Sequence, residues 1–127
     1  MNNNVKFFIC RHCGNLIEIV EDSGVPILCC GEEMEELIPN TVEASGEKHK
    51  PVVRVEGDKV IVSVGSVAHP MVEEHWIEWV WLQTSKGGQY KVIQPGQAPE
   101  AVFQLERETP VAAYAYCNLH GLWKTEL

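Results

Sequence analysis

The fold is decided by the stretch VVRVEGDKVIVSV at residues 52–64. Two runs rich in β-branched residues lie on either side of the pair Gly57-Asp58. Such runs, separated by a two-residue turn, predict a β-hairpin. This part of the chain is therefore expected to be built from β-strands.

The residues that follow continue the β pattern. Further strands are predicted at residues 76–84, 89–94, 101–107 and 111–116, with turns at residues 85–88 and 109–110. The 3.6-residue periodicity of a helix does not persist anywhere in the sequence. About six short strands with closely spaced turns predict a β-sandwich of roughly 90 residues, which places the chain in the all-β class.

Four cysteines lie near the start of the chain, as the pair Cys10 and Cys13 and the adjacent pair Cys29 and Cys30. This spacing suits two loops that converge on one tetrahedral metal ion. Neighbouring side chains of an extended chain point to opposite sides, so both members of the second pair reach one ion only if the backbone kinks, which Gly31 permits. Tetrahedral thiolates accept zinc or iron. The spacing therefore leaves open both a structural zinc site and a redox-active iron site.

The cysteine-bearing segment is too short to fold on apolar burial alone. Below about 40 residues a chain usually needs a metal, disulfides or oligomerisation. A metal bound by the four cysteines meets that requirement. We therefore predict a small metal domain at residues 1–37, followed by the sandwich domain at residues 38–127.

A second group of metal-ligand residues lies in the sandwich. It contains the fifth cysteine and four of the five histidines: His49, His69, His75, Cys117 and His120. Each lies beside a predicted strand, so the loops at one end of a sandwich can bring them together. Taken singly, each histidine is equally well explained as an exposed loop residue. Taken together they make five ligands, whereas zinc prefers four, and this favours iron with one position open for chemistry.

The remaining histidine, His12, is predicted to be an exposed turn residue, because four thiolates already complete the first site. A thiolate in the second site would push electron density through the metal, as it does in haem enzymes that activate oxygen species. The four tryptophans are predicted to be mostly core residues, with Trp76, beside His75, as a possible wall of the site.

Composition excludes several classes of partner. The chain has 127 residues and a net charge of −8, which argues against binding to nucleic acid or to an anionic membrane. Its apolar runs are shorter than the roughly 18 residues that a membrane span needs. Residues 1–6 lack the basic stretch and apolar core of a secretory signal. An odd number of cysteines without such a signal also argues against a disulfide scaffold.

In their order and combination, the motifs resemble desulfoferrodoxin, the two-iron class of superoxide reductase. The resemblance covers the whole chain and rests on five segments: CRHCGN (10–15), CCGEEM (29–34), GEKHKP (46–51), HPMVEEHW (69–76) and CNLHG (117–121). The ligand pattern does not depart from that of the family. A short N-terminal extension, Asn2-Asn3-Asn4, is a minor difference.

The resemblance implies two iron ions per chain. A rubredoxin-type or desulforedoxin-like domain would hold one ion in an Fe(Cys)4 site. An immunoglobulin-like sandwich would hold the other in an Fe(His)4(Cys) site, with the four imidazoles equatorial and Cys117 axial. Superoxide would bind the open sixth position and be reduced to hydrogen peroxide without release of dioxygen. The resemblance further implies a rubredoxin-like electron donor, a homodimer and a cytoplasmic location.

Two residues beside His49 are candidates for catalytic roles. Lys48 would supply a local positive charge, since a chain of charge −8 repels superoxide at distances beyond the Debye length of about 8 Å. The resemblance implies that Glu47 ligates the ferric ion after the product leaves. The alternative for both residues is an ordinary solvated side chain. Backbone N–H groups of Leu119 and His120 are predicted to donate to the Cys117 sulfur.

Two rival interpretations remain open at this level. A non-enzymatic electron-transfer protein with two iron centres would share every ligand and would differ only in activity. A sandwich stapled by zinc, and used to bind a partner protein, would differ in its absorption spectrum, since ferric iron in four thiolates is coloured.

Overall fold

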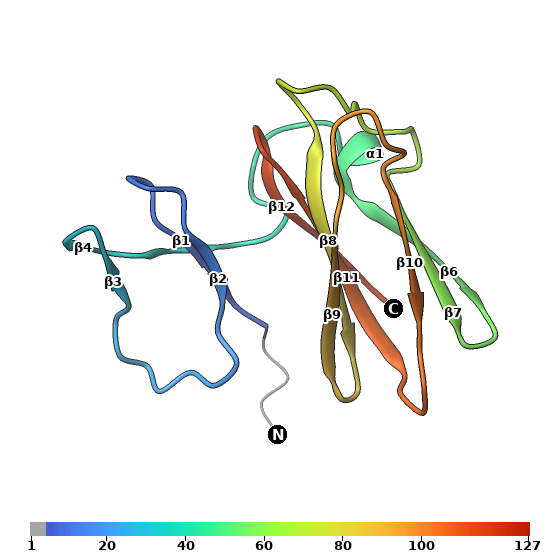
Figure 1. Cartoon of the computed structure of the whole chain (residues 1–127), viewed down its shortest axis with the longest axis horizontal. Coiled ribbons are helices and arrows are strands. Elements are labelled where there is room, and N and C mark those ends of the chain that lie inside the picture. Colours follow the sequence, from blue (N-terminus) through green and yellow to red (C-terminus); the bar gives the residue numbers. More distant parts are fainter. Residues whose placement is uncertain (1–4) are drawn as a thin grey trace. The chain divides into compact units, whose positions relative to one another are not determined.

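A computed structural model of the chain describes residues 5–127 (Figure 1). The chain divides into two compact units, which we call the N-terminal unit (Met1–Ile38) and the C-terminal unit (Pro39–Leu127). The division lies one residue from the predicted boundary. The predicted extension at residues 2–4, and most of the stretch used to argue against a secretory signal, lie outside the described residues. Among the described residues, no helix is long and apolar enough to span a membrane.

The N-terminal unit contains very short strands. One antiparallel sheet has the order β2 (Leu16–Glu18), β1 (Phe7–Ile9) and β5 (Glu35–Leu37), and a separate ribbon pairs β3 (Leu28–Cys29) with β4 (Glu32–Glu33). The sequence did not predict β4 and β5, because the glutamates that dominate residues 32–36 have low β propensity. Their strands are specified by pairing across the unit, which local composition does not show.

The C-terminal unit consists of two antiparallel sheets. The first has the order β10 (Glu100–Gln104), β7 (Lys59–Val64) and β6 (Pro51–Glu56); the second has the order β12 (Gly121–Glu126), β11 (Pro110–Cys117), β8 (Ile77–Thr84) and β9 (Gly87–Val92). These sheets confirm the all-β class and the sandwich. The predicted hairpin is also confirmed, with Glu56 paired to Lys59 across the turn Gly57-Asp58 and a φ of +62° at Gly57.

Several details of the C-terminal unit differ from the prediction. Strand β10 ends at Gln104 rather than at residue 107, and β9 begins at Gly87, inside the predicted turn. Strand β12 was not predicted, because its short and mixed composition gives no period-two signal; it is specified by pairing with β11. The four-residue helix α1 (Gly46–His49) was also missed, since one turn is too short to show a helical period.

The core of the C-terminal unit lies between its two sheets. Alternate residues of the strands supply it, as the period-two geometry of a strand requires: β7 contributes Val60, Val62 and Val64, and β11 contributes Ala113, Ala115 and Cys117. Figure 1 shows α1 and the loop that precedes β8 at the same end of the sandwich as the turn between β11 and β12. The histidine-bearing segments therefore meet at this end, directly above the end of β11.

Candidate metal centres

The four N-terminal cysteines converge in one cluster. Their sulfur atoms lie within 4.8 Å of one another, and Cys13 Sγ lies 3.6 Å from Cys29 Sγ. The first pair sits in a tight loop in which Gly14 N donates to Cys10 O (2.8 Å) and Gly14 has a φ of +84°. The cluster therefore has the separations that one tetrahedral ion requires.

The predicted kink at the second pair is a two-residue hairpin turn. Cys29 pairs with Glu32 across Cys30-Gly31, and these two residues have φ values of +53° and +77°. Two consecutive positive φ values are typical of the type I′ turn. The kink was predicted at Gly31, and Cys30 also adopts the left-handed conformation.

The electrostatics of this cluster favour a cation. Backbone N–H groups, first that of Cys13, lower the pKa of the Cys10 thiol to about 6. Hydrogen bonds to the thiols of Cys10, Cys13 and Cys29 raise the pKa of Cys30 to about 12. A thiolate is thus easily formed at Cys10, whereas neighbouring thiols oppose thiolates at Cys29 and Cys30. A metal ion would stabilise several thiolates at once, because its positive charge offsets their mutual repulsion and it binds thiolates rather than thiols.

The four C-terminal histidines form a square of rings. Ring centroids are 4.6 Å apart for His49 and His69, 4.6 Å for His69 and His75, 5.0 Å for His75 and His120, and 4.8 Å for His120 and His49. Neighbouring rings meet edge to face, whereas His49 and His75, on one diagonal, are 6.3 Å apart. This is the arrangement of four equatorial ligands around one centre.

Hydrogen bonds orient two of these rings so that their lone pairs meet. His49 Nδ1 donates to Ser45 O (2.7 Å) and His69 Nδ1 donates to Pro70 O (2.7 Å). In the neutral ring this leaves each Nε2 as an acceptor. The two Nε2 atoms nevertheless lie only 3.1 Å apart, with no proton to share. A cation between them satisfies both lone pairs, which explains the contact.

Burial favours the neutral form of three of the four rings, those of His69, His49 and His75. It lowers the pKa of His69 to about 4 and also lowers the pKa of His49 and His75. The Lys48 charge lowers the pKa of His49 and His75 further, so this ammonium group acts on the square. Neutral imidazoles are the form that binds metal.

The remaining atoms of the cluster also point to a metal. His75 Nε2 is buried and has no hydrogen-bond partner among the described residues. The ligand atoms of His49, His69, His75 and Cys117 lie within 4.8 Å of one another. His120 falls outside that group, but its Nδ1 lies 3.0 Å from His49 Nε2 and 3.8 Å from Cys117 Sγ. A buried nitrogen without a hydrogen-bond partner, close to other potential metal ligands, is typical of a metal site and unusual in an ordinary loop.

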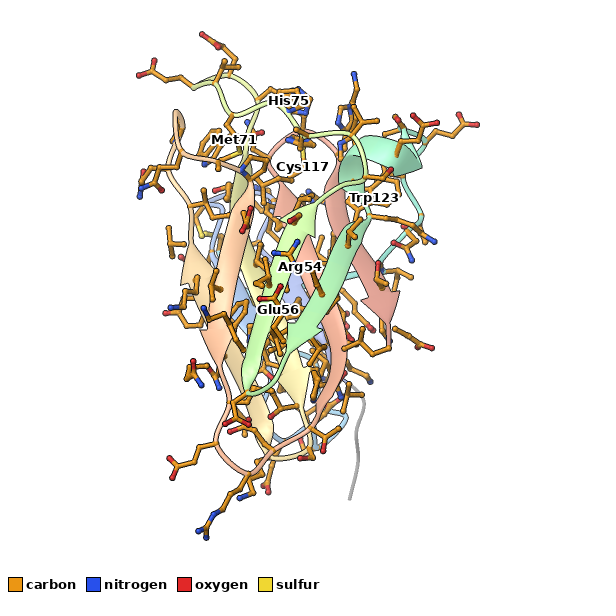
Figure 2. The ribbon with its side chains drawn as sticks, turned by 90° about the vertical axis from the view of Figure 1, so that its right-hand side faces the viewer. Arg54, Glu56, Met71, His75, Cys117 and Trp123 are labelled. Atoms are coloured by element: carbon orange, nitrogen blue, oxygen red, sulfur yellow. The ribbon has the colours of Figure 1, made fainter. Side chains whose placement is uncertain are left out.

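The Cys117 sulfur lies inside the core. Its side chain is 0% exposed and belongs to the hydrophobic cluster between the sheets. Burial raises the pKa of its thiol, and backbone N–H groups of Leu119 and His120 act against that rise. These are the two N–H groups predicted to donate to the sulfur. Figure 2 shows Cys117 and His75 at the same end of the sandwich.

Comparisons with known proteins agree with this geometry. The family model for desulfoferrodoxin matches residues 41–126. The desulfoferrodoxin of Nitratidesulfovibrio vulgaris is 44% identical over 126 residues, which is 99% of each chain. The chain belongs to the desulfoferrodoxin family. The crystal structure of the superoxide reductase from Treponema pallidum superposes with a TM-score of 0.83 at 41% identity, and covers 97% of this chain and 99% of that one. The single-iron superoxide reductase of Giardia intestinalis matches with a TM-score of 0.53 at 33% identity, over 64% of this chain and 99% of its own.

The two clusters correspond to the two iron sites of a desulfoferrodoxin, as expected from the resemblance. The structure brings together the four cysteines of the first site and the four histidines and Cys117 of the second. His12 lies outside the first cluster, and its Nε2 is 3.0 Å from Glu32 Oε2 on the surface.

Glu47 and Lys48, the predicted catalytic residues of this desulfoferrodoxin, lie in α1 beside His49 and are exposed. Backbone contacts anchor their segment: Val67 N donates to Glu47 O (3.0 Å), and so does Ser66 Oγ (3.2 Å). Gly65 lies against the same carbonyl, where an added Cβ would clash with Glu47 O. A glycine at position 65 is therefore needed to bring the two segments together.

Sequence reasoning missed three residues that shape the second site. The Trp123 ring stacks on His49 (5.0 Å between centroids), and its Nε1 donates to His120 O (3.1 Å). The backbone N–H of Trp76 donates to Asn118 Oδ1, and the role of its ring as a wall of the site stays a prediction. Asn118 and Trp123 lie within a few residues of two ligands, which is a usable signal. Gly65 carries no signal, because a sequence does not show which carbonyl approaches it.

Proposed function

We propose that the protein is a superoxide reductase, in which the histidine square and Cys117 form the reaction site. The observation that carries this proposal is the meeting of unprotonated lone pairs, above all those of His49 and His69, beside the Cys117 sulfur, which is fully enclosed in the core. Iron bound there supplies the single electron that, with two protons, converts superoxide to hydrogen peroxide.

The side chains divide the space around the site into two sides. Cys117 approaches from the core, and α1 with its exposed residues Glu47 and Lys48 flanks the square near the solvent. These residues would hold an iron ion that an anion could reach from water, on the side away from Cys117. Solvent on this side also supplies the two protons.

Lys48 attracts the anion to this side. Its charge already acts on His49 and His75, whose pKa values it lowers. A local ammonium group offsets the net charge of −8 within about one Debye length. We therefore assign the attraction of superoxide to Lys48. Replacement of this lysine tests the assignment.

Glu47 is proposed as the ligand of the oxidised site. A carboxylate is a hard ligand and prefers the ferric ion to the ferrous one. Its backbone carbonyl is fixed by Ser66 and Val67, so the side chain starts from a defined point beside the square. Glu47 would take the open position after hydrogen peroxide leaves.

The electron donor, the assembly and the location are inferred from the family relationship. A rubredoxin-like protein would re-reduce the iron, and two chains would form a homodimer. All five cysteines are free of disulfides, and thiols that must bind metal need the reducing conditions of the cytoplasm. Electron transport to the site and a cytoplasmic location are accordingly part of the proposal.

Stoichiometry distinguishes the proposed reaction from its alternatives. Ferrous protein is mixed with a measured dose of superoxide under anaerobic conditions, and both peroxide and dioxygen are recorded; the zinc-loaded protein is the control. A reductase yields one peroxide per superoxide and no dioxygen. Dioxygen at half the superoxide dose would show dismutation, and iron that stays ferrous would show a protein that only transfers electrons between partners.

A further inference from the structure

We propose that Asn118 is a positioning residue for the ligand His75. Its side-chain amide clamps the loop that carries His75 to the turn that carries Cys117 and His120. The proposal rests on the metal site of the proposed function, but concerns how that site is held rather than what it reduces.

Both ends of the Asn118 amide are used. Its Nδ2 donates to Glu74 O (3.0 Å), and its Oδ1 accepts from Trp76 N (3.0 Å). The two bonded groups belong to the residues immediately before and after His75. A third bond, from Asn118 N to Trp76 O (3.3 Å), joins the same two segments. The amide therefore brackets His75 from both sides.

The backbone of His75 is closed on the remaining side by Val72. His75 N donates to Val72 O (3.0 Å), and Val72 N donates to His75 O (3.1 Å). Every peptide group from Glu74 O to Trp76 O thus has a partner either within the loop or on Asn118. The loop cannot swing away from Cys117 without breaking several of these bonds.

His75 differs in this respect from two other histidines of the square. His49 and His69 are oriented by their own rings, whose Nδ1 atoms donate to carbonyl oxygens. In the part of the chain that the structure describes, no ring hydrogen bond orients His75, and its Nε2 is buried without a partner. The orientation of His75 therefore depends on its backbone, and Asn118 is the side chain that fixes this backbone.

The position of Asn118 in the chain gives the clamp its effect. It directly follows Cys117 and lies two residues before His120, so the rigid end of β11 determines where its amide sits. Through Asn118, the His75 nitrogen is held at a set distance from the Cys117 sulfur. Outer partners of this kind typically affect metal affinity by about 10- to 100-fold.

The chain contains a matched control. Asn40 makes the same pair of bonds to one strand residue, with Nδ2 to Lys124 O (3.1 Å) and Lys124 N to Oδ1 (2.9 Å), and it brackets no ligand. Asn118→Ala and Asn40→Ala each remove two such bonds. Asn118→Asp keeps the acceptor for Trp76 N and removes the donor to Glu74 O.

The test measures iron retention in the full-length two-iron protein. A ferrous chelator is titrated against each variant, with the four-cysteine iron of the same molecule as an internal reference, and the ferric thiolate charge-transfer band of the second site is recorded. We expect Asn118→Ala to lose the second iron at about 10- to 100-fold lower chelator concentration and to shift the band, with Asn118→Asp between it and wild type. Asn40→Ala should match wild type in both.

Equal retention and an unchanged band in Asn118→Ala and Asn40→Ala would overturn the proposal. If Asn118→Ala does not fold, Asn118→Asp decides: a wild-type band and wild-type retention in that variant overturn it, and a shift with weaker retention supports it. None of these readouts requires turnover, so a failure of superoxide reduction would count against the proposed function and not against the clamp.

Discussion

The two metal clusters lie in units that are stabilised in opposite ways. Strands of the N-terminal unit are two or three residues long, and two of its ligands, Cys13 and Cys30, are exposed. Strands of the C-terminal unit reach eight residues and enclose thirteen core residues, one of which is the ligand Cys117. The first unit is therefore expected to need its metal for folding, whereas in the second the packed fold holds the ligands.

This difference matters for the chemistry assigned to each site. A site whose ligands sit on a packed sandwich keeps its geometry when an anion binds or the iron changes charge. A site whose metal stabilises the fold is expected to have all four coordination positions filled by protein ligands, with none left for a substrate. We therefore expect the open position in the site of the C-terminal unit.

Removal of one ligand from each unit tests whether the two units depend differently on their metals. Cys13→Ser should unfold the N-terminal unit, because metal binding contributes on the order of 10 kcal/mol to folding in comparable sites. His69→Ala should remove the second iron and leave the sandwich folded. Amide hydrogen exchange, resolved by residue, measures both effects. A C-terminal unit that loses protection throughout in His69→Ala would contradict the account.

Gly65 tests whether the sandwich positions the segment with Glu47 and Lys48. Gly65→Ala places a Cβ against the Glu47 carbonyl and should destabilise the protein by about 1–3 kcal/mol through overpacking. Gly46→Ala is the control, since its Cβ would have no atom within 4 Å. Urea denaturation gives the two free energies of unfolding. Equal values would show that Gly65 is not needed for this contact.

Lys48 tests whether a charge beside the histidine square speeds the encounter with superoxide. Lys48→Ile should slow the encounter of the ferrous protein with superoxide several-fold and flatten its dependence on salt. Lys59→Ile makes the same change in net charge on β7, about 17 Å from the site end of the strand, which exceeds a Debye length. Pulse radiolysis measures both rates. Similar effects of the two variants would remove Lys48 from the account.

Glu47 should give the smallest change in rate and a clear change in spectrum. Glu47→Ala leaves the first encounter nearly unaltered, because the carboxylate prefers the ferric ion formed afterwards. Water or hydroxide then takes its place in the oxidised protein and shifts the charge-transfer band of the second site. A large drop in the encounter rate, or a ferric spectrum identical to that of wild type at every pH, would exclude this role.

The sequence predicted those features that local pattern controls. The hairpin at residues 52–64 was predictable because both strands and their turn are contiguous. The ligands were predictable because nearly all cysteines and histidines of the chain fall into two groups of motifs. Strand β12 and the ribbon strand β4 were not, since their strand state comes from pairing with partners outside the local sequence. Local composition does not encode such pairing.

Support around the ligands was harder to predict than the ligands themselves. Trp123 was expected to be a core residue, and it is buried, but its stacking on His49 depends on how β12 pairs with β11. The role of Gly65 depends on a close approach by a carbonyl eighteen positions away in the sequence. Contacts of this kind follow from tertiary structure alone.

The most direct test asks which iron reduces superoxide. The full-length ferrous protein carrying Cys13→Ser, and the protein carrying His69→Ala, are compared by pulse radiolysis with peroxide measured at the end. We expect the Cys13→Ser protein to keep the wild-type rate constant and to yield peroxide. The His69→Ala protein, with its four-cysteine iron intact, should form no peroxide through reduction of superoxide by its iron. A Cys13→Ser protein that retains its second iron and fails to react, or a His69→Ala protein that reacts at the wild-type rate, would contradict it.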